Sequence, residues 1–195
     1  MKLILLSLFL SFNLFAGTGT HGGDGWLDEE GKPYLYDLKE GELHLNPYIA
    51  DVDIDIKIKE RISNSIYFLQ EKTLNALTKK LVEIENIYPS MAESILVGIE
   101  LFQWNLSDTI IDIKDEDPIL SIPIERQVQL AGRKNRDIYI DKNYLSLLTP
   151  ENSAALIIHE IIYAWVTPIK IQISKKELVL RQKSANARSI VRYLF

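Results

Sequence analysis

The feature that most constrains the fold is one apolar helix with a His-Glu pair at its centre. Thr149 and Pro150 are residue types favoured at an N-cap and at the first helical position, so the helix is predicted from there to about Val166. Apart from His159 and Glu160, its central part is apolar on all sides, which is typical of a helix buried all round. Because burying an unpaired charge is costly, both side chains need partners.

One interpretation of the pair is catalytic. A helical His-Glu-x-x-His motif places two imidazoles one turn apart to bind zinc, with the glutamate as general base. His159 is then the metal ligand, and Glu160 and Tyr163 are the catalytic candidates. The alternating stretch 137–141 lies before the helix, as a strand does in the zinc proteases called zincins. However, Tyr163 stands where the second histidine belongs, and neutral tyrosine is a poor zinc ligand.

The remaining histidines, His21 and His44, lie far from this helix in the sequence. A complete zinc site requires one of their segments to fold over the helix. His21 adjoins two glycines, which allow close approach of the backbone, so His21 is a candidate binding residue. The alternative is a solvated histidine in a loop, since residues 17–31 are rich in glycine and threonine.

The other interpretation of the pair is a buried polar network. Glu160 would pair with an arginine of a C-terminal helix, for which Arg188 is the natural candidate. His159 and Tyr163 would hydrogen-bond to backbone or to the Gly-rich N-terminal segment. Such networks fix the register of packed helices. A binding pocket or metal-free catalysis with the same residues also stays open.

The start of the chain has the features of a secretory signal peptide. Lys2 precedes the apolar run 3–15, and Ala16 is a small residue at the expected cleavage position. The run is shorter than the roughly 20 apolar residues that span a bilayer, and an uncleaved amphipathic anchor is the alternative. We therefore expect residues 17–195 to form a periplasmic or secreted domain without a transmembrane segment. Its partner, a protein or another component of the cell envelope, is not indicated by the sequence.

Charge and cysteine content narrow the class of protein. Loss of Lys2 takes the formal net charge from −5 to −6, which offers no general basis for binding nucleic acid. The chain has no cysteine, so disulfides cannot stabilise it. An exported domain of this composition must be stable through its core alone.

Helical periodicity dominates the middle of the chain. Residues 58–88 are predicted to form one long helix, or two helices joined by a break. Alternation within 52–58 leaves open whether a strand precedes them. Ser90 and Glu93 have capping-box spacing, and a further helix is predicted over 91–104.

Strand signals lie mainly after this helical part. Residues 127–130 and 137–141 alternate and predict a hairpin with its turn at 132–135. Residues 168–173 alternate again, and 32–38 is predicted as a short strand or the start of a helix. Together these elements predict a single α+β domain, in which a helical middle packs on a small sheet and the His-Glu helix is buried between them.

Three basic residues, Arg133, Lys134 and Arg136, fall at the tip of the predicted hairpin. Such a cluster can bind a phosphate or an anionic polymer. A solvated turn is the more common explanation for charges at this position, and it is the one we expect.

Several motifs together resemble those of a group of exported bacterial proteins whose activity is not established. The matching segments are Gly22-Gly23-Asp24-Gly25, Tyr36-Asp37-Leu38-Lys39-Glu40, Gln127–Leu130, Tyr139-Ile140-Asp141, Ala154–Tyr163 and Ser184–Phe195. They cover both ends and most of the second half of the chain, whereas the helical middle matches only in character. The resemblance implies that Tyr163 belongs to the motif, which weakens the zinc-protease interpretation. Members of the group often carry cysteines that this chain lacks, so no disulfide is implied here.

Overall fold

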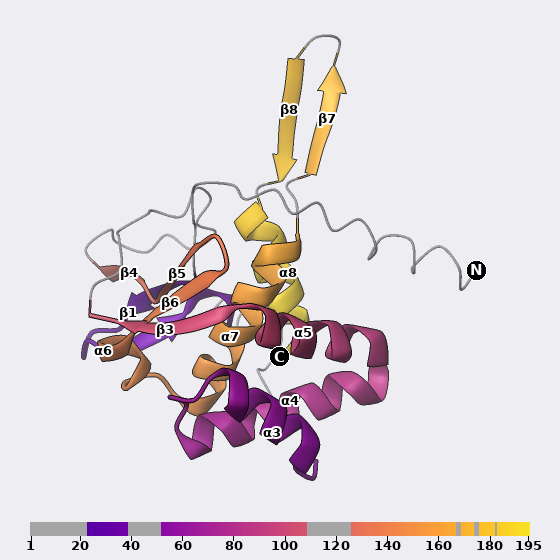
Figure 1. Ribbon diagram of the computed structural model, residues 1–195. Helices are drawn as coiled ribbons and strands as arrows, with labels where there is room; N and C mark the ends of the chain where they lie inside the picture. Colours follow the sequence, from indigo (N-terminus) through magenta and orange to yellow (C-terminus); the bar gives the residue numbers. More distant parts are fainter. Residues whose placement is uncertain (1–22, 39–51, 109–125, 167–168, 174–175, 182) are drawn as a thin grey trace.

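The computed structural model describes residues 23–38, 52–108, 126–166, 169–173, 176–181 and 183–195 (Figure 1). The predicted signal peptide, His21 and His44 lie outside these residues. The described elements form an α+β fold, as expected, in which helices pack beside small sheets.

The first sheet begins with a β-hairpin near the start of the described chain. Strand β1 (Asp24–Leu27) pairs antiparallel with β2 (Pro33–Leu35) and, on its other side, with β4 (Gln127–Gln129). Gly31 in the connecting turn has φ +80°, a left-handed conformation that favours glycine. Residues 36–38 then continue as a helical turn, so both expectations for the segment 32–38 apply in succession.

Helices α3 (Ile56–Ser65) and α4 (Glu71–Ile87) confirm the prediction of two helices joined by a break. The stretch 52–58 contains no strand, because the Asp55 carboxylate accepts hydrogen bonds from the amides of Lys57 and Ile58 and starts α3 as its N-cap.

Helix α5 (Pro89–Leu101) departs from the prediction at both ends. Its N-cap is Tyr88 and Pro89 occupies the first turn, so the expected capping box of Ser90 and Glu93 was wrong. The Glu93 carboxylate instead binds Arg61 of α3 at the surface. The chain leaves the helix after Leu101 and enters β3, a few residues earlier than expected.

The second sheet has the strand order β3-β6-β5 and consists of β3 (Gln103–Ser107), β5 (Ala131–Lys134) and β6 (Asp137–Asp141). Strand β6 pairs parallel with β3 and antiparallel with β5. The expected hairpin therefore exists, but its first strand is β5, and residues 127–129 pair with β1 instead. The turn is also tighter than predicted, with Asn135 at φ 58°.

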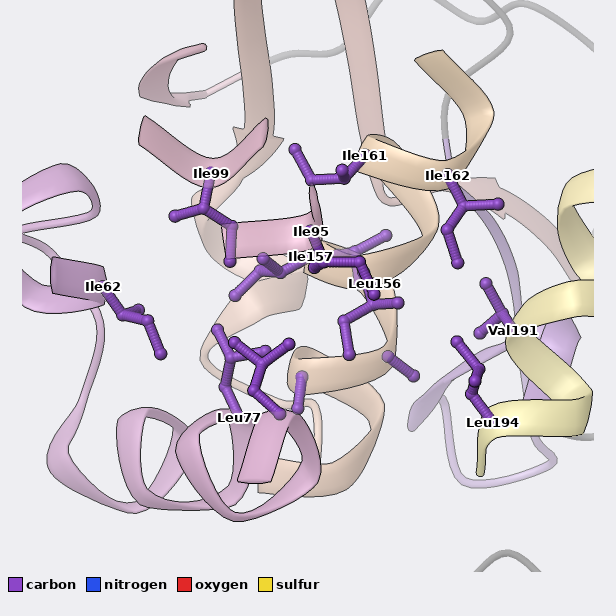
Figure 2. Packing of buried hydrophobic residues seen from close by; sticks show 14 of the residues in the cluster. Ile62, Leu77, Ile95, Ile99, Leu156, Ile157, Ile161, Ile162, Val191 and Leu194 are labelled. Atoms are coloured by element: carbon purple, nitrogen blue, oxygen red, sulfur yellow. The ribbon is translucent and has the colours of Figure 1, made fainter. Parts of the chain in front are cut away.

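Helix α6 (Lys142–Leu145) leads to α7 (Pro150–Trp165), the helix with the His-Glu pair. The Thr149 hydroxyl accepts a hydrogen bond from the Asn152 amide, and Pro150 occupies the first turn, as predicted. The helix is buried from Asn152 to Tyr163, because it packs against α4, α5 and the C-terminal helix α8 (Lys183–Leu194). Figure 2 shows the aliphatic side chains that fill the space between these helices.

Strands β7 (Ile169–Ile173) and β8 (Lys176–Arg181) form an antiparallel hairpin between α7 and α8. The alternation predicted at 168–173 is thus confirmed as a strand. In Figure 1 this hairpin projects away from the other elements. Among the residues described, no helix is long and apolar enough to cross a membrane.

Candidate functional site

Helix α7 presents three polar side chains to the N-terminal hairpin. Asn152, His159 and Glu160 are seven and eight residues apart, about two helical turns, so they lie on one side of the helix. All three are buried. The first contact of this set is a hydrogen bond of 2.9 Å from the backbone amide of Leu35, in β2, to the Asn152 side-chain oxygen.

The central contact joins His159 to Asp37. Nδ1 of His159 lies 2.6 Å from Oδ2 of Asp37, and the two residues are 3% and 1% exposed. Asp37 belongs to the helical turn that directly follows β2. Burial alone lowers the pKa of His159, but the charge of Asp37 and its hydrogen bond, with smaller contributions from Glu160 and Asp24, raise it to about 9. His159 is therefore an imidazolium at neutral pH.

This protonation state bears on the zinc interpretation. Both ring nitrogens of an imidazolium carry hydrogen, so neither has a lone pair to offer a metal. Among the residues described, no group of three or more His, Cys, Asp or Glu side chains could bind a metal ion. The expected partners His21 and His44 lie outside these residues.

Glu160 binds the start of β1. Its Oε1 accepts a hydrogen bond of 2.5 Å from the backbone amide of Gly23, and its side chain is fully buried. Burial raises the pKa of Glu160, opposed by His159, by the Gly23 amide and by Arg133. Within the part of the chain that the structure describes, Oε2 has no hydrogen-bond partner, which agrees with the raised pKa, because an unpaired charged oxygen in the interior is costly.

Gly23 is required by close packing. A Cβ atom at this position would lie 2.1 Å from Cδ1 of Leu156 and 3.2 Å from Oε1 of Glu160. The first distance is far below van der Waals contact, so a side chain at residue 23 would displace either the buried Leu156 methyl group or the strand. We call the three polar contacts that join α7 to the N-terminal hairpin the clamp: Leu35 with Asn152, Asp37 with His159, and Gly23 with Glu160.

Tyr163 and the turn region of the β5–β6 hairpin lie at the other end of the site. The Tyr163 ring stacks on His159 with centroids 5.8 Å apart, and the guanidinium of Arg133 lies 6.0 Å from the Tyr163 ring and 5.7 Å from that of Phe102. Arg136 donates a hydrogen bond of 2.7 Å to the carbonyl of Leu101. Arg136 and Lys134 are exposed, as expected for a solvated turn, whereas Arg133 is partly buried, so that expectation was wrong for Arg133.

The expected partner of Glu160 is replaced. Arg188 is buried on α8, which packs against α7, but among the described residues no ion pair joins Arg188 to Glu160. The hydrogen bond of Glu160 goes to the Gly23 amide instead. Sequence reasoning therefore identified the buried pair and missed Asn152, Asp37 and Gly23 as its partners or companions. Gly23 lies in the Gly-rich segment that one interpretation had placed against the helix, but there the expected hydrogen bonds involved His159 and Tyr163 and not Glu160. Nothing in the motif that contains Asp37 indicated a contact with α7.

Two cavities of the described part lie away from this site. One of about 190 Å³ lies between α3, α4 and α5, and one of about 90 Å³ lies beside α6; neither is lined by His159 or Glu160. Comparison with protein-family models, with curated proteins and with solved structures gave no match. The interpretation of the site therefore depends on its geometry.

Proposed function

We propose that this protein is a non-catalytic structural or binding domain of the cell envelope or of the secreted fraction. The observation that carries the proposal is the burial of the two candidate catalytic side chains, His159 and Glu160. They are hydrogen-bonded to Asp37 and to the amide of Gly23, respectively. A catalytic acid or base must reach a substrate atom within hydrogen-bond distance. Because His159 and Glu160 are buried in this structure, a substrate atom could not come within that distance of either side chain.

The clamp supports a structural role on energetic grounds. Removing one partner from a buried ion pair costs roughly 3–5 kcal/mol, because the other charge is left without compensation. Total domain stabilities are only about 5–15 kcal/mol. In a chain without cysteine, the clamp joins segments more than 100 residues apart, as a disulfide does in many exported domains.

Export is part of the proposal and has its own test. The sequence of residues 1–16 supports it. The full chain is expressed in a bacterial host, and the protein from the periplasm and the medium is sequenced from its N-terminus. A mature start at residue 17 or close to it is expected. Recovery in the cytoplasm with Met1 retained would contradict export.

A metal-dependent hydrolase is the second candidate, and one observation favours it. A carboxylate bonded to one imidazole nitrogen, as Asp37 is to His159, orients histidine ligands in many zinc sites. Zinc would then bind a deprotonated His159, with Glu160 as base. This requires loss of the proton that the Asp37 pair stabilises.

Metal analysis separates the two candidates. The purified mature protein and a His159→Ala variant are equilibrated with zinc, passed over a desalting column and analysed for bound metal. Equal and negligible zinc in both proteins is the result that the structural role predicts. One zinc per chain in the native protein, lost in His159→Ala while the variant remains folded by circular dichroism, would establish the metal site instead.

A further inference from the structure

We propose that residues 23–38, here called the N-terminal arm, form an exchangeable element, and that the groove between β4 and α7 accepts the arm of a second copy of this chain. The proposal rests on the proposed function in one respect, because it treats the polar side of α7 as a receptor for the arm and not as an active site. It goes beyond the proposed function because it identifies a partner, a second copy of this chain.

The groove binds the arm mostly through its backbone. The amides of Gly23 and Leu35 donate to Glu160 and Asn152 of α7. The Gly23 carbonyl accepts a hydrogen bond of 2.8 Å from the amide of Leu130, and β1 extends the pairing along β4. A groove that binds an extended segment in this way is the arrangement of β-strand addition, in which main-chain hydrogen bonds give affinity.

Side-chain contacts make the groove selective for this sequence. A Cβ at Gly23 would overlap Leu156, and a Cβ at Gly25 would lie 2.6 Å from Cδ1 of Leu130. Twelve residues after Gly25, the Asp37 carboxylate must meet the charged His159. A strand from an unrelated protein would have to match both glycines and the carboxylate, whereas the arm of a second copy meets all three conditions.

The order of the chain favours exchange during folding. The clamp contacts of the arm join residues 117 to 137 positions apart. Such non-local contacts form late, because the loop between the partners must close first. Until then the groove is vacant, and at high protein concentration the arm of another copy competes for it.

A peptide-binding experiment with the full chain tests the receptor groove. The acceptor is the Gly23→Ala chain, whose own arm carries the Cβ that overlaps Leu156. The probe is an N-acetylated peptide of residues 23–38 with a fluorophore at its C-terminal end; the acetyl group keeps the Gly23 nitrogen as an amide donor. Fluorescence anisotropy should show saturable binding to the acceptor. Binding to the native chain should be at least about tenfold weaker, because its tethered arm competes at high effective concentration.

Two matched peptides define specificity. Peptides with Gly23→Ala or Asp37→Ala should bind the acceptor at least about tenfold more weakly than the native peptide, a loss of about 1.4 kcal/mol or more. Absence of saturable binding of the native peptide to a folded acceptor would overturn the proposal, and so would equal binding of all three peptides. If the Gly23→Ala chain is unfolded, the native peptide should restore its circular dichroism spectrum, and failure to do so counts against the groove.

Co-refolding tests the second copy itself. Native chains with two different affinity tags are denatured together and refolded at high concentration. Dimers that contain both tags are expected, and refolding with an excess of the native peptide should reduce them. Recovery of monomers alone would contradict exchange between copies. Neither result depends on zinc, so failure here leaves the proposed function standing, whereas zinc bound at His159 would overturn that function and, with it, the receptor role of α7.

Discussion

Nδ1 of His159 and Oδ2 of Asp37 lie 2.6 Å apart in an interior where both side chains are almost completely buried. The two residues are 122 positions apart in the sequence. This contact joins the second half of the chain to its first described elements. It also keeps His159 charged, because the Asp37 carboxylate stabilises the imidazolium against the effect of burial.

The pKa of His159 should depend on Asp37. In the native protein it should be about 9, and Asp37→Asn should lower it below the ordinary value of 6.5, because burial is then opposed only by the smaller contributions of Glu160 and Asp24. NMR titration of the histidine ring protons measures both values, and His159→Ala assigns the resonance. A His159 pKa that Asp37→Asn leaves unchanged would show that another group stabilises the proton.

Stability should fall at alkaline pH. The pKa of His159 is raised from 6.5 to about 9 on folding, so its contribution is fully present below pH 6.5 and is lost as the pH rises through 9. The whole effect amounts to about 3 kcal/mol at most. Urea unfolding between pH 6 and 10 measures it. The slope should be largely absent in His159→Ala, and a native stability that rises with pH over this window would contradict the assigned charge.

Glu160 should tolerate amidation and not truncation. Glu160→Gln keeps an oxygen for the Gly23 amide and removes a charge whose burial is unfavourable, so a loss of less than about 1 kcal/mol is expected. Glu160→Ala leaves the amide without its acceptor and opens a cavity, at a cost of roughly 2–4 kcal/mol. Chemical denaturation of the two variants measures the difference. Equal losses would show that the carboxyl acts as a charge and not as an acceptor.

A surface ion-pair network provides the contrast. Arg61 donates hydrogen bonds to Glu93 and Glu100, both on α5, but these carboxylates are more than a third exposed. Solvent and salt screen such contacts, so Arg61→Ala should cost less than about 1 kcal/mol, and its effect should shrink in high salt. Thermal unfolding at low and high salt checks this. A loss as large as that of His159→Ala would show that exposure is a poor guide to the energetics here.

The helix boundaries were predictable because their signals are local. Thr149 and Pro150 start α7 as expected, and the apolar sequence around the His-Glu pair correctly indicated burial on every side. The capping box at Ser90 and Glu93 failed, since Pro89 begins α5 two positions earlier than predicted and Arg61 binds the glutamate. Local signals can therefore compete, and the backbone constraint of proline prevailed over a side-chain cap.

The partners of the buried pair were not predictable from local pattern. Asp37 and Gly23 reach α7 through strand pairing and close packing between distant segments, and periodicity contains no information about either. The hairpin shows the same limit. Residues 127–129 and residues 131–134 both suit a strand, but they join different sheets. Between them, the Leu130 amide donates a hydrogen bond to the Gly23 carbonyl.

The position of α7 has a mechanical consequence. The N-terminal arm and α8 both attach to this one helix, the arm through the clamp and α8 through aliphatic packing that includes Val191 and Leu194 (Figure 2). A pulling force applied between residues 23 and 195 would therefore act on α7 through the clamp at one end. At the other end it would act on α7 and also on α4, because Lys80 of α4 donates a hydrogen bond to the Leu194 carbonyl and lies over the Phe195 ring. Resistance to stretching should reside in the contacts of α7 and in those of Lys80 with the C-terminal residues, and rupture of the clamp would release the N-terminal arm while the helical middle stayed folded.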